Sequence, residues 1–116
     1  MTYFRLRKRT EYAIAMMSLL ADAKVGEVVS VQVMMQKDIP RSYLVKIAKD
    51  LLKAKLIAAK EGRGGGYILA KDANKLTLLE IVEAVESKIV AKYPNQKLFA
   101  SISNEIEDIL SRYKLR

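Results

Sequence analysis

The fold is decided by residues 41–70, which read RSYLVKIAKDLLKAKLIAAKEGRGGGYILA. The first half predicts a helix over about residues 41–54, because its apolar residues recur at the spacing of one helix face. These residues are Leu44, Ile47, Ala48, Leu51 and Leu52. The second half predicts two short strands, at residues 56–60 and 67–70, joined by the turn EGRGGG. The sequence therefore predicts a helix followed directly by a glycine-tipped hairpin.

The flanking sequence predicts four more helices. The first covers about residues 10–22, with Thr10 as its N-cap, and the second covers residues 31–36, capped by Ser30. Val28 and Val29 predict a short strand between these two helices. Downstream, the sequence TLLE at residues 77–80 is a capping box that opens a helix to about residue 86. Residues 96–114 predict one long amphipathic helix.

This order of elements is that of a winged helix–turn–helix, a mostly α fold with a small β-hairpin wing. We expect residues 1–90 to form this domain and residues 91–116 to form a long C-terminal dimerisation helix, the two making one compact unit. The first three helices already supply a core, so the apolar stripe of the last helix predicts a homodimer interface. The stripe consists of Leu98, Ile102, Ile106, Ile109, Leu110 and Tyr113.

The chain of 116 residues contains no His and no Cys. Imidazole acid–base chemistry, thiol nucleophiles, disulfides and thiolate ligands for metals or iron–sulfur clusters are therefore excluded. No grouping of the remaining reactive side chains resembles a catalytic site, and the lysine and serine or threonine of a nucleotide-binding glycine loop are missing. We expect a protein that is not an enzyme and has no cofactor and no metal site.

The charge of the chain predicts a polyanionic partner. The formal net charge is +8, and the basic residues are concentrated in the first half: residues 1–63 carry 13 basic and six acidic side chains, against eight and seven in residues 64–116. A membrane surface is the alternative polyanion, but no apolar run of 18 residues could span a bilayer. We expect a cytoplasmic protein without a membrane partner.

The helix at residues 41–54 and the hairpin together predict an interface for double-stranded DNA. The major groove admits one helix, whose exposed side chains reach base edges, and a wing lies along the flanking backbone or minor groove. The candidate DNA-binding residues are Arg41, Ser42, Tyr43, Lys46, Lys49, Arg63, Gly64 and Gly65. For Tyr43, a phosphate contact and packing under the wing are alternatives. Arg5, Arg7, Lys8 and Arg9 form either a solvated tail or an arm that touches phosphate.

Two other groups of residues have simpler expected roles. Met16, Met17, Met34 and Met35 lie at helical positions and are expected to fill the core. Glu80, Glu83 and Glu86 are expected to form a solvated face.

Several segments resemble the Rrf2 family of bacterial transcription regulators. They are EYAI at residues 11–14, SYL at 42–44, KAKLI at 53–57, GRGGGYILA at 62–70 and LLEIVEAVE at 78–86. The resemblance implies a homodimer that binds an operator sequence, usually as a repressor. Many members hold an iron–sulfur cluster through three Cys before the dimerisation helix, whereas this chain has none at residues 87–97. The expected function is therefore a cluster-free, sequence-specific regulator acting on a pseudo-palindromic operator. The alternative is a winged-helix module that binds protein or RNA through a non-specific basic face. No effector ligand is indicated.

Overall fold

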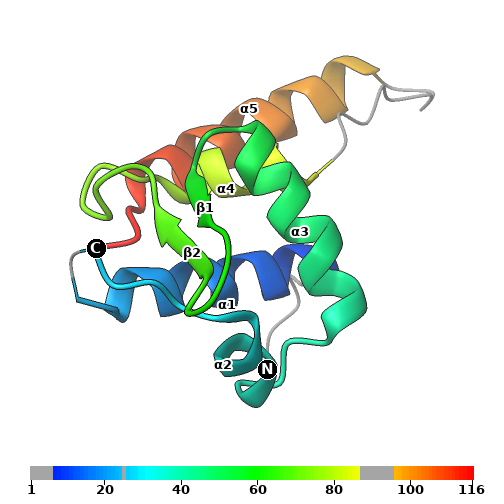
Figure 1. Ribbon diagram of the computed structural model, residues 1–116. Coiled ribbons are helices and arrows are strands. Elements are labelled where there is room, and N and C mark those ends of the chain that lie inside the picture. The colour runs from blue at the N-terminus through cyan, green and yellow to red at the C-terminus, as the bar shows by residue number, and fades with distance from the viewer. Residues whose placement is uncertain (1–6, 25, 87–95) are drawn as a thin grey trace.

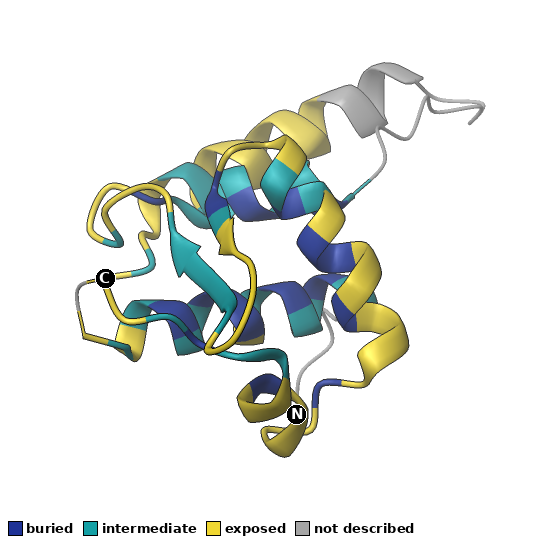
Figure 2. Cartoon of the chain, viewed as in Figure 1, coloured by how far each residue is buried: buried dark blue, intermediate teal, exposed yellow. Residues whose placement is uncertain are grey.

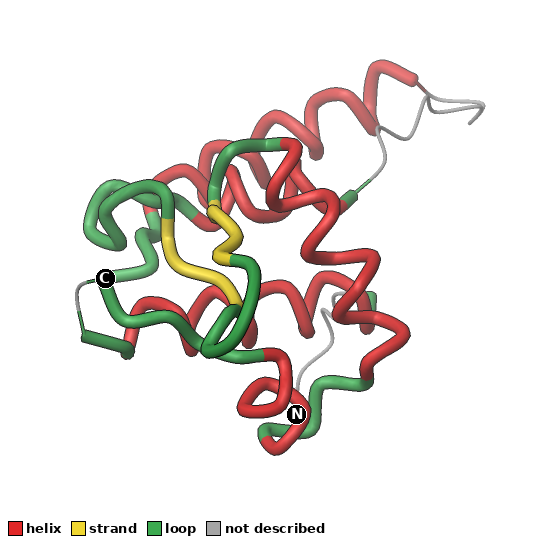
Figure 3. Tube along the Cα trace, in the orientation of Figure 1, coloured by secondary structure: helices red, strands yellow, loops and turns green. Residues whose placement is uncertain are grey.

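The computed structural model describes residues 7–24, 26–86 and 96–116, with the side chains of all of these except residues 96–100. The elements are α1 (Lys8–Asp22), α2 (Val31–Gln36), α3 (Arg41–Lys53), β1 (Ile57–Lys60), β2 (Gly66–Leu69), α4 (Leu78–Val85) and α5 (Gln96–Arg112). Figure 1 shows α1 along one side of the molecule, α4 and α5 along the other, and α3 and the hairpin between them. Figure 3 shows the same chain as mostly helix with one short pair of strands. None of the described helices is long and apolar enough to cross a membrane.

The core lies where α1, α3 and α4 contact one another. Met16 and Met17 enter it from α1, and Ile81 and Val85 enter it from α4, each at most 2% exposed. From α3 come the apolar residues that the sequence assigns to one face: Leu44, Ile47, Ala48 and Leu51 are buried, and Leu52 lies partly buried against them. The predicted buried face of this helix is confirmed. Because that face is held in the core, the opposite face of α3 points to solvent.

The same C-terminal turn ends both α2 and α3. At the end of α3, the amide of Lys55 donates to the carbonyl of Leu52 and that of Leu56 donates to Leu51, each at 3.0 Å. This pair of hydrogen bonds is a Schellman motif. In this motif the residue just after the C-cap adopts a left-handed backbone conformation. Lys55 has φ of 62°, and Asp38 at the corresponding position after α2 has φ of 64°. Neither residue is glycine, so each has the steric cost of a side chain at positive φ, which glycine would not have.

The wing is the antiparallel pair β1–β2, with Ile57 opposite Leu69 and Lys60 opposite Gly66. The strand expected at Val28 and Val29 is reduced to a single bridge, in which Val29 and Tyr67 exchange two backbone hydrogen bonds of 3.0 Å. A Cβ atom at Gly66 would collide with the carbonyl oxygen of Val29. Glycine at this position therefore lets the hairpin approach the segment before α2.

The C-terminal residues fasten α5 to the winged domain. The amide of Leu78 donates to the carbonyl of Tyr113 at 2.8 Å, and the amide of Leu115 donates to Leu76 at 2.7 Å. The helix therefore ends at Arg112 and not near residue 114 as expected, because the backbone of the following residues pairs with the start of α4. α5 also packs along α4.

The capping box at the start of α4 is confirmed. The hydroxyl of Thr77 accepts from the amide of Glu80, and the carboxylate of Glu80 accepts from the amide of Thr77. Lys71 also donates to Glu80 at 2.7 Å, and this hydrogen bond lowers the pKa of Glu80 below its usual value of 4.5, although burial acts in the opposite direction. Glu80 thus joins the end of the wing to α4, and it is not the purely solvated side chain that the sequence suggested.

Three other expectations about side chains are wrong. Thr10 is not an N-cap: α1 begins at Lys8 after Arg7, and Thr10 is fully buried in the helix. Its hydroxyl donates to the carboxylate of Glu86, which also accepts from Arg7, so Glu86 is not merely solvated. Met35 is 42% exposed, because it points away from the core on the side of α2 next to the buried Met34.

We predict that Lys55→Gly raises the free energy of unfolding by about 0.5–1 kcal/mol, because glycine removes the steric cost of a positive φ at the end of α3. Urea unfolding followed by circular dichroism measures this change.

The matched control is Lys53→Gly in the last turn of α3, where the backbone is helical and glycine should cost about 1 kcal/mol. Loss of stability in both variants would contradict the assignment of a left-handed turn at Lys55.

Candidate nucleic-acid interface

The outward face of α3 presents the predicted contact residues together. Arg41, Ser42, Tyr43, Lys46 and Lys49 are all exposed, because the buried residues of α3 lie on the opposite side of the helix. Figure 2 shows this division along α3, with one face buried and the other exposed. The structure therefore brings these five predicted residues onto the exposed part of one helix.

The N-terminus of α3 adds a positive end to this face. Pro40 occupies the N-cap position and supplies no side-chain hydrogen bond to the first turn. Free amides at a helix N-terminus, together with the helix dipole, favour an anion such as phosphate. Arg41 stands at this end of the helix.

The single acidic residue of α3 is neutralised from another helix. Asp50 forms an ion pair with Arg9 of α1, and both side chains are about 30% exposed, at 28% and 32%. In the described part of the chain, the four basic residues of α3 form no ion pair with a carboxylate: Arg41, Lys46, Lys49 and Lys53. Their charge is therefore uncompensated at the protein surface. The sequence does not predict this pair, since residue spacing does not indicate which side chain reaches Asp50.

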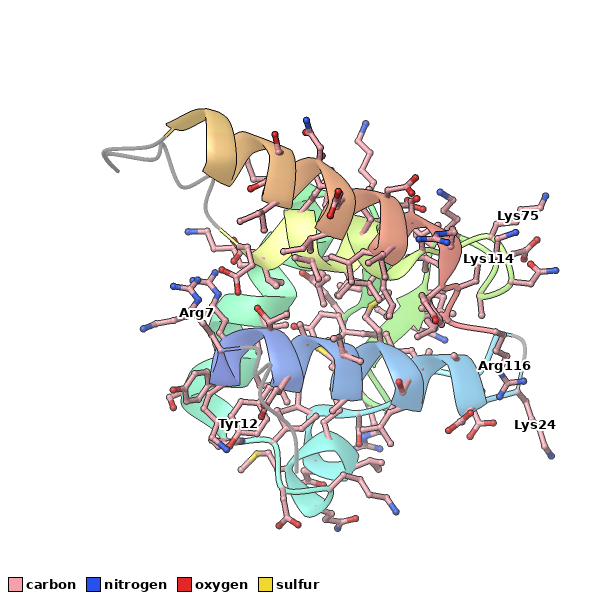
Figure 4. All side chains as sticks on the ribbon, turned by 180° about the vertical axis from the view of Figure 1, so that it is seen from behind. Arg7, Tyr12, Lys24, Lys75, Lys114 and Arg116 are labelled. Carbon is pink, nitrogen blue, oxygen red and sulfur yellow. The ribbon has the colours of Figure 1, made fainter. Side chains whose placement is uncertain are left out.

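Tyr43 packs on α1 and not under the wing, so that alternative for Tyr43 is wrong. Its ring lies 4.9 Å from the ring of Tyr12, at an interplanar angle of 54°. Figure 4 shows Tyr12 at the N-terminal end of α1, beside the start of α3. The ring contact fixes one side of Tyr43 while the residue stays 37% exposed, so a phosphate contact remains open to it.

The wing tip lies beside the N-terminus of α2. Gly62 and Gly64 adopt φ of 88° and 74°, and the amide of Gly65 donates to the carbonyl of Gly62 at 3.0 Å. Arg63 and Gly64 are exposed, whereas Gly65 is partly buried, and an open groove separates the tip from Ser30. Leu52 of α3 also lines this groove, so the wing tip, the start of α2 and α3 surround the same opening. The predicted wing residues therefore form a second exposed group near α3.

The N-terminal basic residues are largely engaged within the protein. Arg7 pairs with Glu86 at 2.7 Å, Lys8 lies 3.8 Å from Glu11, and Arg9 pairs with Asp50. Arg7, Lys8 and Arg9 are therefore not a free solvated tail, and a contact between them and phosphate stays a prediction. Arg5 lies outside the described residues, as do the segment 87–95 and the side chain of Leu98.

The donor atoms of this chain do not fit a metal cluster. The described residues contain no group of three or more Asp, Glu, His or Cys side chains that could hold a metal ion. The whole sequence has no Cys and no His, so it offers only oxygen ligands and backbone groups, which do not by themselves hold a thiolate-seeking iron–sulfur cluster.

A family model matches residues 6–116 of the chain; it describes Rrf2 as an iron-dependent transcriptional regulator. The HTH-type transcriptional regulator IscR of Cronobacter sakazakii is 33% identical over 88 residues, which are 75% of this chain and 54% of that protein. IscR of Escherichia coli K12 is 32% identical over the same coverage. The chain spans about half the length of these two relatives.

Two solved structures have the same fold. IscR of T. potens superimposes with a TM-score of 0.81 at 22% identity, covering 97% of this chain and 84% of that chain. CymR of B. subtilis, described as its global cysteine regulator, gives a TM-score of 0.81 at 20% identity and covers 97% and 93%. The fold of the chain, with its winged helix, is therefore shared with these two structures over 97% of its residues.

We predict that Asp50→Asn lowers the free energy of unfolding by about 1–2 kcal/mol, because it leaves the partly buried guanidinium of Arg9 without its charged partner. Denaturant unfolding measures the loss.

The matched control is Asp108→Asn, which breaks an exposed pair with Arg112 on α5 and should cost less than about 0.5 kcal/mol. Equal losses in the two variants would show that the Arg9–Asp50 ion pair adds no more to the free energy of unfolding than an exposed pair does.

Proposed function

The chain belongs to the Rrf2 family of transcriptional regulators, and we propose that it acts as a homodimeric, sequence-specific DNA-binding repressor that holds no iron–sulfur cluster. Each subunit places α3 in the major groove of one half of a pseudo-palindromic operator, and its wing contacts the flanking DNA. Bound in this way, the dimer represses by excluding other proteins from the operator.

The observation that carries this proposal is the uncompensated basic face of α3. Arg41, Lys46 and Lys49 are exposed without ion-pair partners among the described residues, and the only carboxylate of the helix is held by Arg9. A helix with such a face fits the major groove, where basic side chains reach phosphates and guanine edges. Arg63 on the wing tip extends the basic surface beyond the helix and suits a narrow minor groove.

The outward stripe of α5 supports a homodimer. Ile102, Ile106 and Ile109 are 43%, 37% and 46% exposed, and they repeat on one face of the helix while α5 packs on α4. Leu110 is partly buried, and Tyr113 just beyond the helix is 60% exposed. Pairing of this face with the same face of a second copy would bury the stripe in an isologous interface. We propose residues 91–116 as the dimerisation unit and residues 1–90 as the DNA-binding unit.

The proposed regulator works without the iron–sulfur chemistry found elsewhere in the family. Iron–sulfur clusters are held mainly by cysteine thiolates, with imidazole as the usual substitute, and neither occurs anywhere in the sequence. We therefore propose that neither metal loading nor oxygen controls its affinity for DNA.

For the dimer, we predict that Ile106→Glu yields a monomer in sedimentation velocity, because a charge in the centre of the apolar stripe must be desolvated on pairing. Asn104→Glu, at an exposed position of α5 on the side away from the stripe, should stay dimeric. A dimeric Ile106→Glu protein would rule out α5 as the interface.

For DNA, we predict a linear fall of log K with log salt, with a slope of roughly −4 to −8 for a dimer that neutralises a few phosphates per subunit. Lys49→Ala should weaken operator and random duplex alike and flatten the slope by about one or two units. Arg41→Ala or Ser42→Ala should instead reduce the preference for operator, by about 1–3 kcal/mol where a bidentate base contact is lost.

Arg63→Ala should weaken binding most where the flanking minor groove is narrow and rich in A·T pairs. Fluorescence anisotropy on an operator selected from a random pool measures all four variants. If every variant weakens operator and random DNA equally, the protein reads no bases, and the basic face is a general polyanion surface.

For the cluster, we predict that anaerobic incubation with iron and sulfide leaves no stoichiometric iron and no visible absorption band, and that DNA affinity is the same with and without oxygen. A stable chromophore with bound iron would refute this part of the proposal.

A further inference from the structure

Val45 is an apolar side chain in the middle of a polar surface. It is 59% exposed, more than the other exposed apolar residues of the winged domain, Val33, Met35 and Tyr43. On α3 it follows Ser42 by one turn and precedes Lys49 by one turn, so the three residues lie along the same outward line of the helix. Tyr43 lies off this line, with its ring against Tyr12.

Nothing within the described part of the protein explains a valine at this position. A β-branched residue forms helix slightly less readily than most polar residues, and an exposed one gains little from packing. Val45 gains from burial only if a partner covers it. Because it is surrounded by the residues proposed to contact DNA, the partner that covers α3 also covers Val45.

The major groove offers one apolar group, the C5 methyl of thymine. We propose that Val45 reads this methyl group and so specifies thymine at one position in each half of the operator. The inference rests on the proposed DNA-binding function and adds a specificity-determining residue to it.

The chemistry of valine makes this contact selective. Its side chain has one strongly preferred rotamer in a helix, so its two methyl groups are held in place before DNA binds. It can neither donate nor accept a hydrogen bond, so a cytosine at the same position leaves the exocyclic amino group facing an apolar surface. 5-Methylcytosine carries the same methyl group as thymine, so it should bind better than cytosine at that position.

Ser42 and Lys49 place the thymine contact between two polar contacts. The hydroxyl of Ser42 can bond to either a donor or an acceptor on a neighbouring base, and Lys49 can reach a phosphate. The expected half-site therefore has a thymine next to a base that Ser42 contacts, with a phosphate contact on the Lys49 side.

The test uses the operator selected from a random pool of duplexes and replaces each thymine singly with deoxyuridine, which deletes only the methyl group. With the unaltered protein, one thymine per half-site should show a loss of affinity of about threefold to tenfold, the effect of uncovering one apolar methyl group. With Val45→Ser, the same substitution should have no effect, because the partner of the methyl group has been removed. Serine and valine have similar helix propensities, so folding is matched.

Val33→Ser on α2 is the control, because it also replaces an exposed valine but lies on a different helix. It should leave the deoxyuridine pattern unchanged.

Two negative results are distinguishable. If an operator is selected but no thymine loses affinity in a Val45-dependent way, the inference is overturned while the proposed function stands, and Val45 then fits a protein-docking surface better. If the pool yields no preferred sequence, the proposed sequence-specific function fails, and the inference fails with it.

Discussion

The burial of one face of α3 is the constraint on which the rest of the protein depends. Leu44, Ile47 and Leu51 are each at most 1% exposed, and they fix the rotation of the helix about its axis. Since side chains on a helix repeat every 3.6 residues, this rotation alone decides that the basic residues and Val45 face outward. The left-handed turn at Lys55 then ends the helix and directs the chain into the hairpin, so the wing and the exposed face of α3 are set by the same core.

Ion pairs add to the stability of this arrangement, but the packing of α3 in the core determines it. α1 holds the only carboxylate of α3 through Arg9, and it holds Glu86 at the end of α4 through Arg7 and Thr10. The N-terminal end of α1 therefore joins the two helices that flank it, and it does so with basic residues that could otherwise have served as a free arm. Among the described residues, no carboxylate pairs with the basic side chains of α3 or with Arg63, so a polyanion can approach there.

The sequence predicted the helices and the hairpin well, because helix caps and buried faces depend on residues that are close together in the chain. The buried positions of α3, the Ser30 cap of α2 and the Thr77–Glu80 capping box depend on residues within a few positions of one another, and all are confirmed. The contacts that were missed or misread join distant residues: Thr10 with Glu86, and Tyr12 with Tyr43. Periodicity carries no information about such pairs. The DNA contacts and the dimer interface depend on molecules outside the chain, so they stay predictions.

We propose that the exposed face of α3 reads base sequence. The most direct measurement is the ratio of dissociation constants for a selected operator and for a duplex of shuffled sequence, taken at the same physiological salt concentration. Specific DNA-binding proteins show ratios of about 10³ or more under these conditions, and we expect a ratio in that range for this protein. A ratio near one, with binding that vanishes as salt rises, would contradict it.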